Sequence, residues 1–178
     1  MRKLLWQMMM SLDGFMEGPN RELDWHVTGE EFGRYVRDME KTIDTIVFGR
    51  VTYQMMASYW PSSKEPEAPM MNDLPKVVFS RTLDKVEWKN SRLATGGVEE
   101  EMARLKRQPG KDIALIGSSD LASTFVRLGL IDEIRIFVNP VVLGRGNPMF
   151  KNVDRTALTL LKAQPFRSGN VLLYYRPA

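Results

Sequence analysis

The sequence contains no cysteine and only one histidine, His26, in 178 residues. The absence of cysteine excludes disulfide bonds, thiol catalysis and zinc sites built on cysteine ligands. A single histidine argues against a histidine-rich metal site and against a Ser-His-Asp triad. No apolar run approaches the roughly 20 residues that a membrane-spanning helix needs. Neither a P-loop nor a Gly-x-Gly-x-x-Gly pattern is present, so we expect neither of those nucleotide-binding folds. Because cysteine is absent and there is one histidine, we also expect no metal site.

The composition is that of an ordinary globular protein, with 43% hydrophobic and 26% charged residues. A chain of this length fits one domain, residues 1–178, and buries enough apolar surface to fold without disulfide bonds or metal. The apolar start, Met1–Met10, is interrupted by Gln7 and is followed by no small-residue cleavage site. It therefore predicts a strand rather than a signal peptide.

The net charge of +3 is unevenly distributed along the chain. Residues 1–101 contain 13 basic and 17 acidic side chains, whereas residues 102–178 contain 12 basic and 5 acidic ones. Such asymmetry can indicate a nucleic-acid-binding arm, but here the basic residues are dispersed singly among apolar ones. A solvated surface is the simpler interpretation, and a site for an anionic small molecule is the functional alternative. We expect neither a nucleic-acid partner nor a membrane partner.

Strand and helix patterns alternate along most of the chain, which predicts an α/β domain. Residues Thr28–Ile43 have helical periodicity, and Thr28 and Glu31 match a capping box. The segment Pro61–Pro75 contains four prolines and predicts a loop. The sheet should be mostly parallel and should end in an antiparallel hairpin. The remaining predicted strands are Lys3–Ser11, Thr45–Phe48, Lys76–Ser80, Val86–Trp88, Ser91–Ala94, Ile113–Ile116, Glu133–Val142, Leu158–Phe166 and Val171–Tyr175, and the remaining predicted helices are Arg50–Tyr59, Val98–Arg107 and Ser119–Leu128.

Three of the strand exits have residues suited to binding phosphate. Ligands of open α/β sheets bind outside the carboxyl ends of the strands, so these exits are the segments to examine. In Gly49–Tyr53 a glycine permits a tight turn, the helix start offers unpaired N–H groups, Arg50 adds a cation and Thr52 adds a hydroxyl. Gly117–Leu121 joins a strand to a helix in the same way, and Ser80–Thr82 offers two hydroxyls and a cation. Each pattern alone is equally typical of an ordinary turn or helix cap.

The exit of the first strand carries carboxylates close to an aromatic residue. Asp13 follows this strand, and Asp24, Trp25, His26 and Glu30 come before the first predicted helix or at its start. A carboxylate beside Trp25 in a pocket would have a raised pKa and could donate a proton. The alternatives are an Asx-turn for Asp13 and a favourable first-turn anion for Glu30. His26 is a weaker ligand-binding candidate, because the sequence shows no partner for it.

Taken together, these segments resemble the dihydrofolate reductase-like superfamily, and specifically the C-terminal reductase domain of the riboflavin-biosynthesis deaminase–reductase. The resemblance extends over residues 3–175 in the family's order. It implies a doubly wound sheet of eight or nine strands, NADPH as cofactor, a homodimer and a cytoplasmic location. The segments that carry it are Ser11–Phe15, Asp24-Trp25, Gly49–Tyr53, Val77–Ser80, Ile116–Leu121 and Val138–Gly144.

The resemblance also implies roles for individual residues. In such proteins the Gly-Arg-x-Thr turn and the glycine-rich helix start contact cofactor phosphates, and the turn after the intervening strand meets the adenosine ribose phosphate. The first strand exit lies over the nicotinamide, and an acidic residue after a tryptophan contacts the substrate ring. The implied cofactor-binding residues are Gly49, Arg50, Thr52, Tyr53, Ser80, Arg81, Gly117, Ser118, Ser119, Asp120 and Leu121, the implied substrate-binding residues are Phe15, Asp24 and Trp25, and the implied catalytic residues are Asp13 and Glu30.

These observations predict an NADPH-dependent reductase of a small heterocycle of the pyrimidine or pterin type. A hydride would pass to a C=N or C=O group, and a carboxylate or water would supply the proton. The rival interpretation is a non-catalytic nucleotide-binding or interaction protein that retains the fold. Two positions depart from the riboflavin-pathway pattern, because Ile116 stands where an acidic residue is expected and Ser118 stands where a second glycine is expected.

The late strands carry more apolar side chains than one face of an edge hairpin requires. An exposed apolar patch of that size predicts a dimer interface. The alternative is that helices cover both faces of these strands. The side chains concerned are Ile134, Ile136, Phe137, Val141, Val142, Leu172, Tyr174 and Tyr175.

Overall fold

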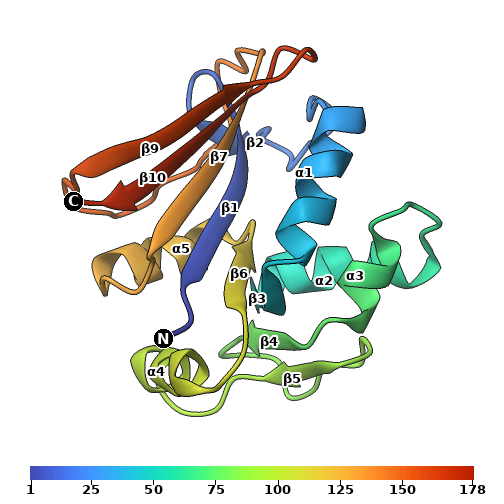
Figure 1. Ribbon diagram of the computed structural model, residues 1–178, viewed down its shortest axis with the longest axis vertical. Coiled ribbons are helices and arrows are strands. Elements are labelled where there is room, and N and C mark those ends of the chain that lie inside the picture. Colours follow the sequence, from blue (N-terminus) through green and yellow to red (C-terminus); the bar gives the residue numbers. More distant parts are fainter.

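An eight-stranded sheet forms the centre of the computed structural model, which describes residues 1–178 (Figure 1). Strand β1 and strands β3 to β7 run parallel to one another. Strand β10 pairs antiparallel with both β7 and β9. The predicted mostly parallel sheet with an antiparallel C-terminal hairpin is thus confirmed. The strand order is β5-β4-β3-β6-β1-β7-β10-β9. The strands are β1 (Leu4–Ser11), β3 (Ile43–Gly49), β4 (Lys76–Phe79), β5 (Ser91–Leu93), β6 (Asp112–Ile116), β7 (Glu133–Asn139), β9 (Leu158–Pro165) and β10 (Val171–Pro177).

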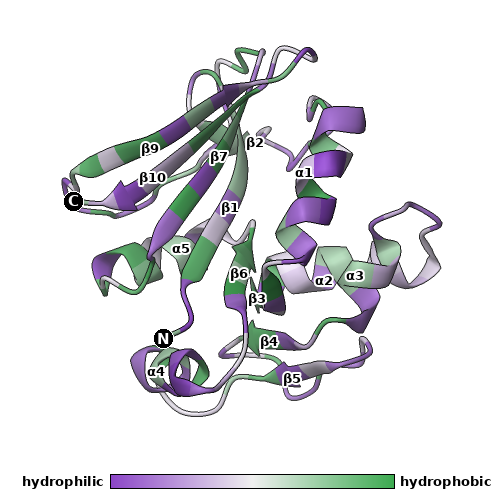
Figure 2. Cartoon of the chain, viewed as in Figure 1, coloured by the Kyte–Doolittle hydropathy of each residue, from purple (hydrophilic) through white to green (hydrophobic).

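Helices cover both faces of the sheet and enclose two separate apolar clusters. The cluster on one face includes Tyr35, Val36 and Met39, and the cluster on the other includes Met102 and Phe125. Figure 2 shows hydrophilic and hydrophobic residues interleaved along the outer helices, as expected for helices with one buried face. None of the helices combines the length and apolar character that crossing a bilayer demands. The first face carries α1 (Glu30–Glu40), α2 (Arg50–Tyr59), the 3-10 helix η1 (Trp60–Ser62) and α3 (Ala68–Asp73), and the second carries α4 (Val98–Arg107) and α5 (Ser119–Arg127).

The first helix and the proline-rich segment differ from their sequence-based predictions. Helix α1 begins after Gly29, and no side chain caps it. The expected Thr28–Glu31 capping box is wrong, because the Glu31 carboxylate accepts a hydrogen bond from the Arg167 backbone N–H at 2.7 Å instead. The predicted loop at 61–75 contains α3, whose proline lies in the first turn, where a missing N–H costs nothing.

Two short strands were missed and one predicted strand is absent. Strand β2 (Phe15–Glu17) pairs antiparallel with β8 (Asn147–Pro148), and both are too short to show alternation in the sequence. No strand forms at 86–88, because the Tyr53 hydroxyl accepts the N–H groups of Glu87 and Trp88 at 3.1 and 3.0 Å. These donors are then unavailable to a sheet.

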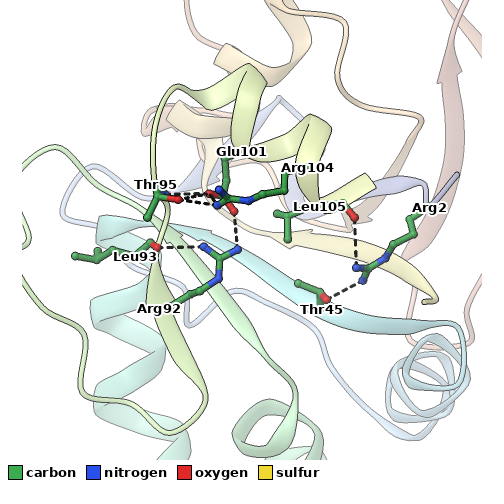
Figure 3. Close-up of polar contacts among 8 residues, drawn as sticks. All are labelled: Arg2, Thr45, Arg92, Leu93, Thr95, Glu101, Arg104 and Leu105. Atoms are coloured by element: carbon green, nitrogen blue, oxygen red, sulfur yellow. Dashed lines mark hydrogen bonds and ion pairs between the residues drawn. The ribbon is translucent and has the colours of Figure 1, made fainter. Parts of the chain in front are cut away.

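A fully buried carboxylate, Glu101, ties α4 to the loop after β5. Figure 3 shows the guanidinium groups of Arg92 and Arg104 directed at it, and Arg92 Nη2 lies 2.6 Å from Oε1. The Thr95 backbone N–H donates to Oε2 at 2.9 Å. Burial raises the pKa of Glu101, but the hydrogen bonds from Arg92 and Thr95 and the charges of both arginines outweigh it, so its pKa is lowered overall.

We expect Glu101→Gln to reduce the free energy of unfolding at pH 7 by about 1–3 kcal/mol, the usual cost of losing charge-assisted bonds at a buried group. Because the folded-state pKa lies below the unfolded value, the carboxylate stabilises the protein above the unfolded pKa and loses this effect as pH falls through the folded pKa. Urea unfolding at several pH values should therefore show the difference between wild type and variant disappearing in acid. Glu99→Gln, an exposed change in the same helix, is the control. A difference that persists below the folded pKa would contradict the assignment.

Candidate active-site cleft

The chain changes face at the carboxyl ends of two neighbouring strands. Strands β3 and β6 are hydrogen-bonded neighbours, yet α2 leaves β3 toward one face of the sheet and α5 leaves β6 toward the other. The two loops therefore diverge and open a crevice, which is the usual position of a ligand in such sheets. The exits of β1, β3, β4 and β6 lie at this same edge, as the sequence predicted, because these strands are parallel.

The two diverging turns are joined by hydrogen bonds at the base of this crevice. The Gly49 N–H donates to Ser118 Oγ at 3.0 Å, and the Ser118 N–H donates to Thr52 Oγ1 at 3.1 Å. Gly117 has φ +59°, and a Cβ there would lie 3.2 Å from Thr52 Cγ2. Ser118 also adopts a positive φ, of 58°, which is unfavourable for serine and is held by these bonds. The turn is thus rigid and brings the backbone close to whatever occupies the crevice.

A cleft of about 540 Å³ opens from this turn and extends between the sheet and the helices of the first face. This volume fits one or two aromatic rings and lies within the range of ordinary small-molecule sites. Eight methionines line it, and thioether side chains adapt readily to flat, polarisable rings. These eight are Met8, Met9, Met16, Met39, Met55, Met56, Met70 and Met71.

The polar groups of the cleft are few and carry no positive charge. Three glutamates, Glu17, Glu65 and Glu67, belong to its lining, which contains no lysine or arginine. His26 also lines it, and burial lowers the pKa of this histidine to about 4, so the imidazole is neutral at pH 7. Its Nε2 atom is buried without a hydrogen-bond partner. No group of three or more His, Asp or Glu side chains is placed to hold a metal ion.

Two buried asparagines hold the loop that carries His26. The Val27 N–H donates to Asn139 Oδ1 at 2.9 Å, and Asn170 Nδ2 donates to the Val27 carbonyl at 2.7 Å. Both asparagines are fully buried, at the end of β7 and at the hairpin before β10. Two strand ends therefore position the segment that forms one wall of the cleft.

Only some of the predicted cofactor residues line the cleft. Thr52, Gly117 and Ser118 do so. Arg50 and Arg81 are exposed, and Arg50 Nη1 donates to Gln54 Oε1 at 3.1 Å. Neither α2 nor α5 has a side-chain cap, so the backbone N–H groups of both helix starts remain free to bind an anion.

The other predicted cofactor residues have local partners. Ser80 Oγ accepts the N–H groups of residues 82 and 83 at 3.1 and 2.9 Å. Asp120 is exposed and lies 3.1 Å from Lys151, Ser119 is buried, and Leu121 packs near Gly49. Tyr53 is buried, its hydroxyl accepts hydrogen bonds from the 87–88 turn, and it does not line the cleft.

The predicted catalytic carboxylates lie outside the cleft. The Glu30 side chain is 84% exposed and pairs with Arg34 at 2.9 Å, so the expected burial of this carboxylate by Trp25 does not occur. Asp13 accepts hydrogen bonds from Ser11 Oγ at 2.7 Å and from the Leu143 and Gly144 N–H groups at 3.1 and 2.7 Å. These bonds, that from Ser11 foremost, lower the pKa of Asp13. Asp13 thus holds the loop at 143–144.

The predicted substrate residues Phe15, Asp24 and Trp25 also do not line the cleft, although their neighbours at positions 16, 17, 23 and 26 do. Trp25 donates from Nε1 to the Glu22 carbonyl at 3.0 Å and packs edge-on against His26. Sequence reasoning missed Gln7 and the methionines. The adjacent methionines at 8–10, 55–56 and 70–71 were a usable signal for the latter, whereas Gln7 stands out in the sequence only as a polar residue within an apolar run.

Comparison with known proteins finds relatives of matching length as well as a longer one that the chain covers only in part. A family model described as RibD C-terminal domain matches residues 2–172. The uncharacterized protein YyaP of Bacillus subtilis (strain 168) is 36% identical, over 98% of this chain and 94% of that protein. The riboflavin biosynthesis protein RibD of Corynebacterium ammoniagenes is 25% identical, over 76% of this chain and 42% of that protein.

Solved structures share the fold at lower sequence identity. A protein from Shewanella sp. PV-4 described in terms of riboflavin biosynthesis has a TM-score of 0.81 at 23% identity, covering 99% of both chains. A deaminase/5-amino-6-(5-phosphoribosylamino)uracil reductase from Thermotoga maritima has a TM-score of 0.72 at 15% identity, over 99% of this chain and 57% of that one. Dihydrofolate reductase from Enterococcus faecalis, complexed with NADP(H), has a TM-score of 0.66 at 17% identity, over 98% and 96%. The predicted dihydrofolate reductase-like fold is therefore confirmed.

We expect Asn139→Ala to release the wall of the cleft that contains His26. Loss of the bond to Val27 leaves a partly buried N–H unpaired, which costs about 1 kcal/mol of stability. Hydrogen exchange should show faster exchange at residues 23–29 than in wild type. Asn20→Ala is the control, because Asn20 is exposed and its side chain bonds only to Glu22, two residues away. Unchanged protection of residues 23–29 would show that Asn139 does not hold this loop.

Proposed function

The chain belongs to the RibD C-terminal domain family, and from this membership we propose that it is an NADPH-dependent reductase of a small heterocyclic substrate of the pyrimidine or pterin type. The observation that supports this most directly is the cleft at the switch point of the sheet, which is bordered by two uncapped helix starts. The solved structures named as reductases share this fold, which is compatible with the proposal.

The residues at the switch point fit a dinucleotide cofactor. The close approach allowed by Gly117 and the free N–H groups of α2 and α5 suit a pyrophosphate. Arg50 and Arg81, both exposed, would hold the additional phosphate that distinguishes NADPH from NADH. When bound, the cofactor supplies a hydride. Asp120 does not oppose such binding strongly, because its carboxylate is exposed and pairs with Lys151.

The remaining space would hold the substrate ring. Its apolar, methionine-rich walls exclude water and suit a flat heterocycle. Because Glu30 points into solvent, a proton would reach the reduced ring from water or from a glutamate of the cleft rather than from Glu30. We assign Asp13 the supporting role of ordering the loop at 143–144. The rival function, nucleotide binding without catalysis, would use the same cofactor residues but give no turnover.

We also propose that the protein is a homodimer, although not through all the residues that the sequence suggested. Ile134, Ile136, Phe137 and Leu172 are buried within the chain. The edge strand β9 instead exposes three leucines. An apolar edge strand is a ready surface for pairing with a second copy. The exposed side chains are Leu158, Leu160 and Leu161.

We expect NADPH to stabilise the protein more than NADH does. At about one hundred times its dissociation constant a ligand adds roughly 2.7 kcal/mol, which raises the Tm of a chain of this size by several degrees. Arg50→Ala should remove most of the advantage of NADPH over NADH in a thermal-shift assay. Arg107→Ala, at an exposed arginine of α4, is the control. Equal shifts with both cofactors in the wild type would overturn the phosphate assignment.

Light scattering should give a mass near twice the monomer value of 20.5 kDa. Leu160→Glu places a charge on the exposed apolar strand and should halve the measured mass, whereas Thr159→Glu on the same strand is the matched control. A wild-type mass near that of the monomer would refute the homodimer.

A further inference from the structure

Gln7 is the only amide side chain among the residues that line the cleft. It lies on β1, opposite Ile116 of β6 and Arg135 of β7, and is 8% exposed. Its backbone carbonyl accepts the Gly117 N–H at 3.0 Å, which ties it to the turn at the switch point. Gln7 is thus held where the substrate and the cofactor would meet.

A chain of buried and partly buried polar groups sets the orientation of this amide. Arg135 Nε donates to Glu133 at 2.7 Å, and Arg135 Nη1 approaches the Tyr35 hydroxyl at 3.5 Å. Tyr35 Oη lies 3.0 Å from Gln7 Oε1. A guanidinium can only donate, so the Tyr35 oxygen accepts from Arg135. Its proton has two acceptors within reach, and Gln7 Oε1 at 3.0 Å is closer and stronger than the thioether sulfur of Met39 at 3.6 Å. Burial raises the pKa of Tyr35 to about 12, so this hydroxyl keeps its proton at neutral pH.

The oxygen end of the Gln7 amide is therefore occupied, and the nitrogen end is free. No group of the chain accepts a hydrogen bond from Nε2. This nitrogen is also absent from the buried atoms that lack a partner, so it keeps access to the cleft. Two N–H donors thus stand on the floor of a mostly apolar site. When a bound ring displaces water from the cleft, this donor becomes buried and needs an acceptor, because leaving it unpaired is costly.

We propose, on the basis of the reductase function above, that Gln7 orients the substrate ring by donating from Nε2 to a ring carbonyl oxygen. The substrate is then a lactam-type heterocycle, such as a pyrimidinedione or a pteridinedione, rather than its amino-substituted analogue. Tyr35 and Arg135 act as positioning residues, since they fix the amide and do not line the cleft. The carboxamide of the nicotinamide offers the same acceptor, so the experiment must separate the two sources.

A matched pair of rings tests the acceptor directly. Pteridine-2,4-dione presents carbonyl oxygens where 2,4-diaminopteridine presents amino groups. Calorimetric titration of the NADPH-bound protein should show the wild type binding the dione about tenfold or more tightly than the diamine. Gln7→Glu, which keeps the size of the side chain but replaces donors with acceptors, should reverse this preference. Gln108→Glu, at an exposed amide at the end of α4 and far from the cofactor residues, should leave it unchanged.

Tyr35→Phe tests the positioning role separately. Without the hydroxyl proton either end of the Gln7 amide can face the cleft, so the preference for the dione should shrink while NADPH affinity stays the same. This variant also keeps the proposal testable if Gln7→Glu fails to fold.

The outcomes separate this inference from the proposed function. No NADPH binding by the wild type would refute the reductase proposal and the inference with it. If NADPH binds but the wild type shows no preference for the dione, or the preference survives both Gln7→Glu and Tyr35→Phe, the inference fails and the reductase proposal stands. If Gln7→Glu weakens NADPH while leaving ring preference intact, the acceptor is the nicotinamide carboxamide, and the substrate assignment is wrong.

Discussion

The pairing of β3 with β6 is the constraint on which the cleft depends. These neighbours are parallel, so both end at the same edge of the sheet, but their helices leave to opposite faces. The crevice between them cannot be filled by either helix. The bonds from Gly49 to Ser118 and from Ser118 to Thr52 then hold the two turns together, and the positive φ of Ser118 is maintained by them. The result is a rigid base with a free helix start on each side, from which the cleft opens.

Buried and partly buried polar groups give the mostly apolar cleft its defined geometry. Asn139 and Asn170 pair with the same residue, Val27, and so determine where the wall containing His26 lies. Tyr35 and Arg135 act on Gln7 from the α1 side and from β7. Methionine side chains alone would accommodate many rings in many orientations, because they are flexible and weakly directional. A few fixed hydrogen-bonding groups among them can convert such a site into one that prefers a single orientation.

Most of the fold was predictable from the sequence. Buried strands such as Thr45–Phe48 and Ile113–Ile116 are short apolar runs bounded by turns, and the alternation with helices identifies a parallel sheet. The turn at Gly117 and the apolar composition of the late strands could also be inferred from the sequence. The exceptions have local causes: β2 and β8 are too short for periodicity, and α3 tolerates a proline in its first turn. The predicted capping box does not form, because Glu31 accepts a hydrogen bond from a residue 136 positions away along the chain.

The sequence by itself determined the order and type of the elements and the edge of the sheet at which a ligand would bind, because periodicity and strand direction are local properties. Which side chains face that ligand was decided only by the tertiary structure. Glu30 and Tyr53 stand beside matching motifs but do not line the cleft, since helix phase and a hydrogen bond to a distant turn set their directions. In the sequence Gln7 is visible only as a polar residue within an apolar strand, with no indication of what it faces. It acquires its orientation from Tyr35 and Arg135, residues 28 and 128 positions away along the chain, which only folding brings within hydrogen-bonding distance of one another.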